Sequence, residues 1–83
     1  MRIIKKSIDK LVPFKVKAIN LSTKQMQDLL FSFGCGWTGL RSHKYINCGT
    51  YFFVDSEKRM YYSLEGEYFK YHEYQEISEE FLL

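Results

Sequence analysis

The sequence predicts a small α+β fold in which an antiparallel sheet of about four strands packs against one main helix. Three segments lead to this prediction: an alternating stretch at residues 14–19, a capped amphipathic stretch at residues 20–34 and an aromatic hairpin at residues 51–63. The chain has 83 residues, which is the size of one domain, so we expect residues 1–83 to form a single domain.

The N-terminal segment, residues 1–12, has two interpretations. Its apolar residues have helical spacing, which favours a short helix or a separate N-terminal arm, whereas residues 2–6 also fit a short strand. A basic amphipathic helix could touch a membrane or an acidic partner, but such a segment more often covers the core. We therefore expect no membrane binding, and Pro13 should end the segment.

A strand is predicted directly after the proline. Phe14, Val16 and Ala18 alternate with Lys15 and Lys17. Because side chains in a strand point alternately to opposite faces, this period of two predicts a strand that is buried on one face.

The clearest helix is predicted between Asn20 and Gly34. Ser22 and Gln25 have the spacing of a capping box at its start, and Gly34 stands where a left-handed residue would end it. The helix carries one apolar stripe, made of Met26, Leu29, Leu30 and Phe33. A short helix cannot bury such a stripe alone, so we expect a sheet to cover it.

Residues 34–50 contain four of the five glycines, which indicates turns and irregular backbone. Trp37 is predicted to start a short strand. The GCGWTG sequence is not a phosphate-binding loop, because it lacks the required order of glycines and lysine and follows a helix instead of preceding one.

A β-hairpin is predicted at residues 51–54 and 59–63, with residues 55–58 as its turn. This turn places Val54 opposite Arg59. One face then carries only uncharged side chains, Tyr51, Phe53, Met60 and Tyr62, and we assign it to the helix. The other face carries Phe52, Val54, Arg59 and Tyr61. A slip of one residue would exchange the two faces.

The predicted core combines the helix stripe, the first strand and this uncharged face: Phe14, Val16, Met26, Leu29, Leu30, Phe33, Tyr51, Phe53 and Met60. Beyond the hairpin, residues 64–72 should turn at Gly66 and continue with aromatic side chains. Residues 73–77 are predicted to form a last strand, and Ser78 to cap a short terminal turn.

The charge of the chain is polarised from end to end, although its net value is only +2. Residues 1–17 carry six basic side chains and one acidic one, a net charge of +5, and residues 60–83 carry one basic and six acidic side chains, a net charge of −5. Two interpretations stay open: the two ends are neighbours in the fold, or the basic end is a binding surface.

The sequence favours a cytoplasmic protein. We find no signal peptide and no apolar run of about 20 residues, and two cysteines without a CxxC pair indicate free thiols in a reducing compartment. The candidate zinc ligands, Cys35, His43, Cys48 and His72, lack the paired spacing of zinc sites, so no metal or cofactor is expected.

Enzyme activity is not expected either. Cys48 with His43, or Cys35 with His72, would be the candidate nucleophile and base, but no local signature supports either pair. The acidic residues cluster near the C-terminus in the manner of a solvated face.

The candidate binding surface is the sheet face that the helix leaves open. Basic side chains interleaved with aromatic rings could follow phosphates and stack on bases, or could form the centre of a protein interface. The residues of this surface are Lys15, Lys17, Phe52, Arg59 and Tyr61, with Arg41 and Lys44 from a nearby basic loop. A third interpretation is that the C-terminal segment folds across this face and buries it. The sequence also leaves open a homodimer.

The spacing of aromatic residues resembles that of short, mostly uncharacterised accessory proteins of tailed bacteriophages, of the host-takeover or anti-defence type. The similarity covers residues 14–83 and rests on Phe31, Gly34, Trp37, Tyr51, Phe52, Asp55, Met60, Tyr61 and the ending from Tyr74 to Ser78. The basic N-terminal segment departs from the pattern.

This resemblance implies a protein that binds and blocks a host factor, such as a toxin, a nuclease or another defence component, in the host cytoplasm. It carries over no functional residue. The leading hypothesis is therefore a non-enzymatic inhibitor that binds a host protein, and the alternative is RNA binding through the basic and aromatic face.

Overall fold

The computed structural model describes residues 8–37, 45 and 49–83. Within them the chain forms five strands and three helices, so the predicted α+β class is confirmed. In chain order the elements are β1 (Phe14–Lys17), α1 (Thr23–Ser32), β2 (Gly36–Trp37), β3 (Tyr51–Val54), β4 (Arg59–Ser63), α2 (Gly66–Tyr71), β5 (Gln75–Ile77) and α3 (Glu79–Leu82).

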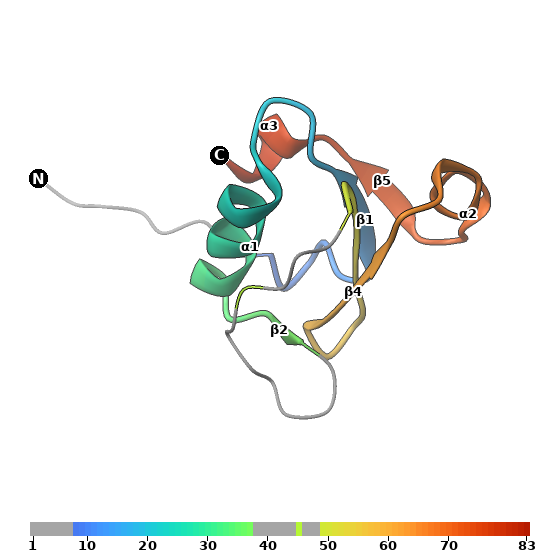
Figure 1. The fold of residues 1–83 in the computed structure, drawn as a ribbon. Coiled ribbons are helices and arrows are strands. Elements are labelled where there is room, and N and C mark those ends of the chain that lie inside the picture. The colour runs from blue at the N-terminus through green and yellow to red at the C-terminus, as the bar shows by residue number, and fades with distance from the viewer. Residues whose placement is uncertain (1–7, 38–44, 46–48) are drawn as a thin grey trace, which may run out of the picture.

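The sheet has five strands in the order β2-β4-β3-β1-β5, where about four antiparallel strands were predicted. The three central strands are antiparallel, but β5 runs parallel to β1 and β2 runs parallel to β4. The edge strands β2 and β5 each follow a helix, which returns the chain in the direction of the strand before it, and these preceding strands, β1 and β4, run in the same direction. The crossovers are β1–α1–β2 and β4–α2–β5, and Figure 1 shows α1 and α2 on opposite sides of the sheet.

The main core lies between α1 and the sheet. Met26 and Leu30 of α1 are fully buried, whereas Leu29 and Phe33 pack partly exposed at its margin. The sheet contributes five side chains to this core: Phe14, Val16, Phe52, Val54 and Met60. Other segments contribute Ile8, Ala18, Cys35, Trp37 and Leu82.

Local interactions define both ends of α1, as predicted. The Gln25 N–H donates to the Ser22 hydroxyl at 3.1 Å, and the Ser22 N–H donates to the Gln25 side chain at 2.9 Å, which completes the capping box. Beyond the helix, Gly34 adopts a φ of +90°, a conformation that glycine reaches without a steric penalty.

The hairpin register differs from the prediction by one residue, so the β3 side chains exchange faces, whereas Met60 of β4 lies in the core as predicted. Val54 lies opposite Met60, and Asp55 extends the ladder because its N–H donates to the Arg59 carbonyl at 3.0 Å. The loop is closed by Lys58 at a φ of 64°. As a result Phe52 and Val54 belong to the main core, while Tyr51 and Phe53 lie on the opposite face, contrary to the prediction.

The two ends of the chain also depart from the predictions. Residues 66–71 form the helix α2 where a turn was expected, and the last strand is shorter than predicted. Residues 1–7 lie outside the described part, and the rest of the predicted N-terminal helix or strand is a turn in which the Leu11 N–H donates to the Ile8 carbonyl at 2.9 Å. Among the described residues, no helix combines the length and the apolar character that crossing a membrane requires.

Candidate functional site

The sheet face opposite α1, here termed the reverse face, is partly covered by the C-terminal segment. Phe69 of α2 is buried, and its ring centroid lies 5.1 Å from that of Tyr51 and 5.7 Å from that of Phe53. This aromatic contact forms a second, smaller cluster. The third interpretation of the sequence, that the C-terminal segment folds across this face, therefore applies to part of it.

Lys15 attaches α2 to the sheet. The side chain leaves β1 on the reverse face, and the ammonium group donates to the carbonyls of Phe69, Lys70 (3.2 Å) and His72 (3.0 Å). These carbonyls belong to the last turn of α2 and its C-cap, where backbone acceptors lack partners within the helix. Lys15 is only 5% exposed, so its charge serves the fold instead of a ligand.

The uncovered part of the reverse face is a groove between the β3–β4 hairpin and α2, with a volume of about 660 Å³. Ligand pockets in proteins have volumes of this order. Most of its lining is aromatic: Phe53, Tyr61, Tyr62, Tyr68, His72 and Tyr74. Ser63, Leu64 and Glu65 complete it. We refer to this feature as the aromatic groove.

His72 is the centre of the ring contacts in the aromatic groove. Its ring centroid lies 4.6 Å from that of Phe53, 5.5 Å from that of Tyr68 and 4.3 Å from that of Tyr74. The Tyr74 N–H donates to His72 Nδ1 at 3.2 Å, so the proton of the neutral imidazole resides on Nε2. The packed rings give the groove a preformed floor.

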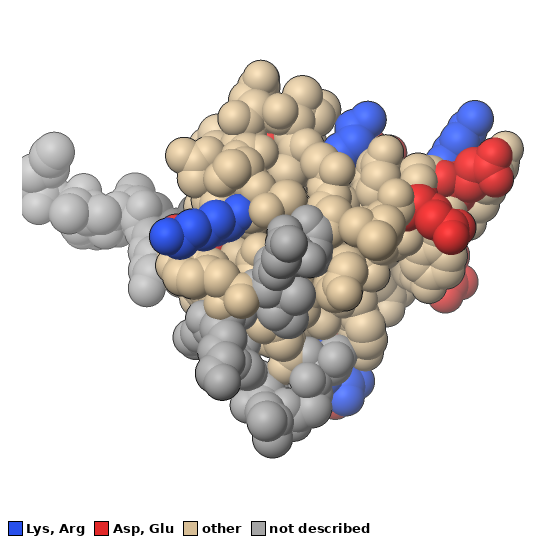
Figure 2. Space-filling model, in the orientation of Figure 1, with Lys and Arg blue, Asp and Glu red and all other residues tan. Residues whose placement is uncertain are grey.

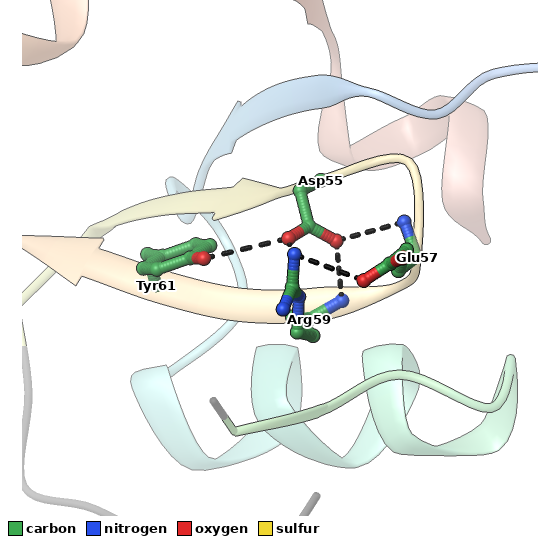
Figure 3. Close-up of polar contacts among 4 residues, drawn as sticks. All are labelled: Asp55, Glu57, Arg59 and Tyr61. Carbon is green, nitrogen blue, oxygen red and sulfur yellow. Dashed lines mark hydrogen bonds and ion pairs between the residues drawn. The ribbon is translucent and has the colours of Figure 1, made fainter. Parts of the chain in front are cut away.

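One end of the aromatic groove adjoins the hairpin turn, which Asp55 organises (Figure 3). Its carboxylate accepts hydrogen bonds from the N–H groups of Glu57 (2.8 Å) and Arg59 (2.9 Å), and it pairs with the Arg59 guanidinium at 2.7 Å. The Tyr61 hydroxyl lies 3.4 Å from the same carboxylate. Burial favours a raised pKa for Asp55, but these hydrogen bonds outweigh it and hold the pKa below its usual range.

Negative charge also affects Tyr74. Burial raises the pKa of its hydroxyl, and the charges of Asp55 and Glu73 raise it further. Both carboxylates are therefore close enough to influence the aromatic groove electrostatically.

The structure separates the residues of the predicted binding surface. Phe52 lies in the main core, and Lys15 is buried under α2, so their expected exposure is wrong. Lys17 is half-buried on β1, and Arg59 pairs with Asp55 and with Glu57. Tyr61 is the one residue of this set that lines the aromatic groove in the described part of the chain. Arg41 and Lys44 lie outside the described residues.

The remaining groove residues were missed because α2 was not predicted. Tyr68, His72 and Tyr74 reach the groove only when residues 66–71 turn as a helix. A signal was present, because Glu67 in the first turn and Lys70 in the last complement the helix dipole. Gly66 at the first helical position favoured the prediction of a turn instead, since glycine is a poor helix former.

The geometry gives no support to the catalytic pairs considered above. Cys35 belongs to the main core on the α1 side of the sheet, whereas His72 packs on the reverse face. Burial raises the pKa of the Cys35 thiol to about 12, which suppresses the nucleophilic thiolate. His43 and Cys48 lie outside the described residues, among which no three His, Cys, Asp or Glu side chains are grouped to bind a metal ion.

Comparisons with protein families, with curated proteins and with solved structures find no match to this chain. A functional role is therefore inferred from the aromatic groove itself.

Proposed function

We propose that this chain is a non-enzymatic binding protein that holds a protein partner through the aromatic groove. The observation that supports this proposal is a preformed groove whose rings reach solvent: Tyr61 is 42% exposed and Tyr68 is 55% exposed. Tyrosines supply large contact areas and are enriched among the residues that dominate binding energy at protein interfaces.

The resemblance to phage accessory proteins adds the identity of the partner to the proposal. In that interpretation the partner is a host factor, such as a toxin or a nuclease, and binding inhibits it. The proposed site of action is the host cytoplasm.

RNA binding, the alternative from the sequence, receives less support from the geometry. Lys15 and Arg59 would have to contact phosphates, but Lys15 is occupied with α2 carbonyls and Arg59 with two carboxylates. Phe52, which would have to stack on a base, is fully buried. A single-strand binder needs a positively charged path for the backbone, and these contacts occupy two of the three basic residues predicted for it in the described part of the sheet.

The test is affinity purification from a lysate of the bacterial host, followed by titration of the identified partner. We expect Tyr68→Ala to weaken binding by about tenfold or more, as truncation of a central interface tyrosine does. Inhibition of the partner's own activity should weaken in parallel.

Tyr71→Ala is the matched control on the same helix. Tyr71 is 76% exposed, but it does not line the aromatic groove, and the Lys70 ammonium lies 5.5 Å from its ring centroid. We expect this variant to bind as tightly as the wild type. Partner binding that is unchanged by Tyr68→Ala, or the absence of a specific protein partner, would contradict the proposal.

A further inference from the structure

The lining of the aromatic groove carries an acidic side chain. Among the described residues, its lining includes Glu65 and neither lysine nor arginine. At one end the Tyr61 hydroxyl lies 3.4 Å from the Asp55 carboxylate, and at the other Glu73 stands between the lining residues His72 and Tyr74 in the chain. Figure 2 shows acidic side chains at the end of the molecule that α2 occupies, with basic side chains beside them.

Three basic side chains around the aromatic groove already have partners. The ammonium of Lys15 is bound to three backbone carbonyls, and Arg59 is paired with Asp55 and Glu57. The Lys70 ammonium lies over the ring of Tyr71, which is outside the groove. A ligand in the groove therefore meets aromatic faces and Glu65, for which the described residues provide no ion-pair partner.

This combination selects a cation. The face of an aromatic ring carries negative electrostatic potential, so it attracts a positive group placed within about 6 Å of its centre. A nucleotide could stack on the same rings, but the Glu65 carboxylate would repel its phosphates.

Among biological cations the guanidinium fits best. It is planar and weakly hydrated, stacks on aromatic rings, and can at the same time donate in-plane hydrogen bonds to a carboxylate such as that of Glu65. A lysine ammonium would lose more hydration on entering the groove and cannot make the paired in-plane bonds.

We propose that the aromatic groove receives an arginine side chain of the partner protein, with the guanidinium stacked on its rings and paired with Glu65. This inference rests on the proposed function, because it specifies the chemistry of the partner residue that the groove holds.

The test uses two short peptides that differ only in the terminal group of one side chain. The first is acetyl-Gly-Gly-Arg-Gly-Gly-amide, and the second carries citrulline in place of arginine, which keeps the shape and removes the charge. Backbone amide chemical shifts of the full chain are followed during titration. We expect the arginine peptide to shift the amides of Tyr68, His72 and Tyr74, and the citrulline peptide to bind at least about fivefold more weakly.

Two pairs of variants locate the binding site. Tyr68→Ala and Glu65→Gln should each lower the affinity for the arginine peptide by about threefold or more, because the first removes a ring and the second removes a carboxylate. The controls are Tyr71→Ala and Glu67→Gln, which lie on α2 but outside the groove lining. They should leave the affinity for the arginine peptide unchanged. Glu65 makes no side-chain capping bond to α2, so its replacement does not remove a helix cap.

Equal affinity for the two peptides would overturn the inference, as would shifts confined to residues outside the groove or tighter binding of an oligouridylate. These outcomes are distinct from failure of the proposed function. If Tyr68→Ala still weakens the partner protein while the two peptides bind equally, the groove holds a protein by other chemistry and only the present inference fails.

Discussion

Lys15 shows how one residue can change its role once the chain folds. In the sequence it is a basic residue on the exposed side of an alternating strand, yet in the structure its ammonium is buried against the end of α2. Its three N–H donors meet three carbonyls at the C-terminal end of α2, where most carbonyls lack partners within the helix. The side chain thus positions α2, and with it one wall of the aromatic groove.

We predict that Lys15→Met lowers the free energy of unfolding by about 1–3 kcal/mol, because buried carbonyls lose a charged donor. Urea denaturation would measure the change, and amide exchange at residues 69–72 should accelerate. Lys17→Met, on the same strand but half-buried, is the control and should change stability by less than about 0.5 kcal/mol. Equal effects of the two substitutions would refute the role given to Lys15.

Asp55 determines the register of the hairpin. Its backbone N–H continues the ladder, and its carboxylate binds the N–H groups of Glu57 and Arg59, so the loop begins one residue later than the composition of the turn indicates. Because the side-chain period of a strand is two, this single step places Phe52 in the core and Phe53 on the reverse face.

Asp55→Asn should destabilise the protein by about 1–3 kcal/mol at neutral pH. The folded pKa of Asp55 is lowered, so the unfolded state binds the proton at higher pH and the stabilisation is present above the unfolded pKa of about 4. It is lost as the pH falls through the folded pKa. The difference between the variant and the wild type should therefore shrink in urea titrations repeated from pH 5 to pH 2.

Glu57→Gln is the control for this prediction, because Glu57 is exposed and contacts Arg59 only from the surface. We expect it to change stability little at any pH in this range. A gap between Asp55→Asn and the wild type that stays constant down to pH 2 would count against the ionised carboxylate as its source.

At the scale of elements, α1 and α2 form for different reasons. The first helix is specified locally, since Ser22, Gln25 and Gly34 mark its ends within a few residues. The second begins at a glycine, and its preceding residue Glu65 makes no side-chain cap. Short helices are marginal without packing, so α2 depends on Phe69 and Lys15 to hold it on the sheet.

Ser22→Ala should cost about 1 kcal/mol, because the N–H of Gln25 loses its acceptor. Ser78→Ala is a matched control: Ser78 occupies the same position before α3 but makes no side-chain capping bond. Thermal unfolding of the two variants should show a clear decrease in Tm for the first and almost none for the second. A similar decrease for both would mean that the hydroxyl bond is not the cause.

At the scale of the whole molecule, the structure places the acidic C-terminal segment beside β1. Strand β5 lies beside β1, with Lys15 opposite Glu76 in the register. The Glu79 carboxylate, 3% exposed, accepts hydrogen bonds from the N–H groups of Asn20 (2.6 Å), Ile19 (3.0 Å) and Leu21 (3.2 Å). The C-terminal segment thereby secures the loop that leads into α1.

Glu79→Gln should lower the Tm at neutral pH, because a neutral amide is a weaker acceptor for these three N–H groups. The hydrogen bond from Asn20 and those from its neighbours outweigh burial and lower the pKa of Glu79, so its stabilisation is present above the unfolded pKa and is lost as the pH falls through the folded one. The Tm difference should therefore diminish between pH 7 and pH 3. Glu80→Gln, exposed on the same helix, should leave the Tm unchanged at both pH values.

Sequence reasoning located most elements but few residues of the site. The strands at residues 14–17 and 51–54 and the helix around Leu30 were predicted, because their periodicity and caps are local. Of the predicted binding residues, Tyr61 reached the aromatic groove. The groove needs the register and α2 together, and neither leaves a periodic pattern in the sequence.

The sequence by itself determined the α+β class, the capped helix α1 and the apolar residues that it buries, because these follow from contacts between residues three or four positions apart. Only the tertiary structure decided which face of the hairpin meets α1, that Lys15 supports α2, and that aromatic rings meet carboxylates on the reverse face. Those outcomes depend on atoms distant in the chain, such as the Lys15 ammonium and the His72 carbonyl, whose approach no local pattern encodes.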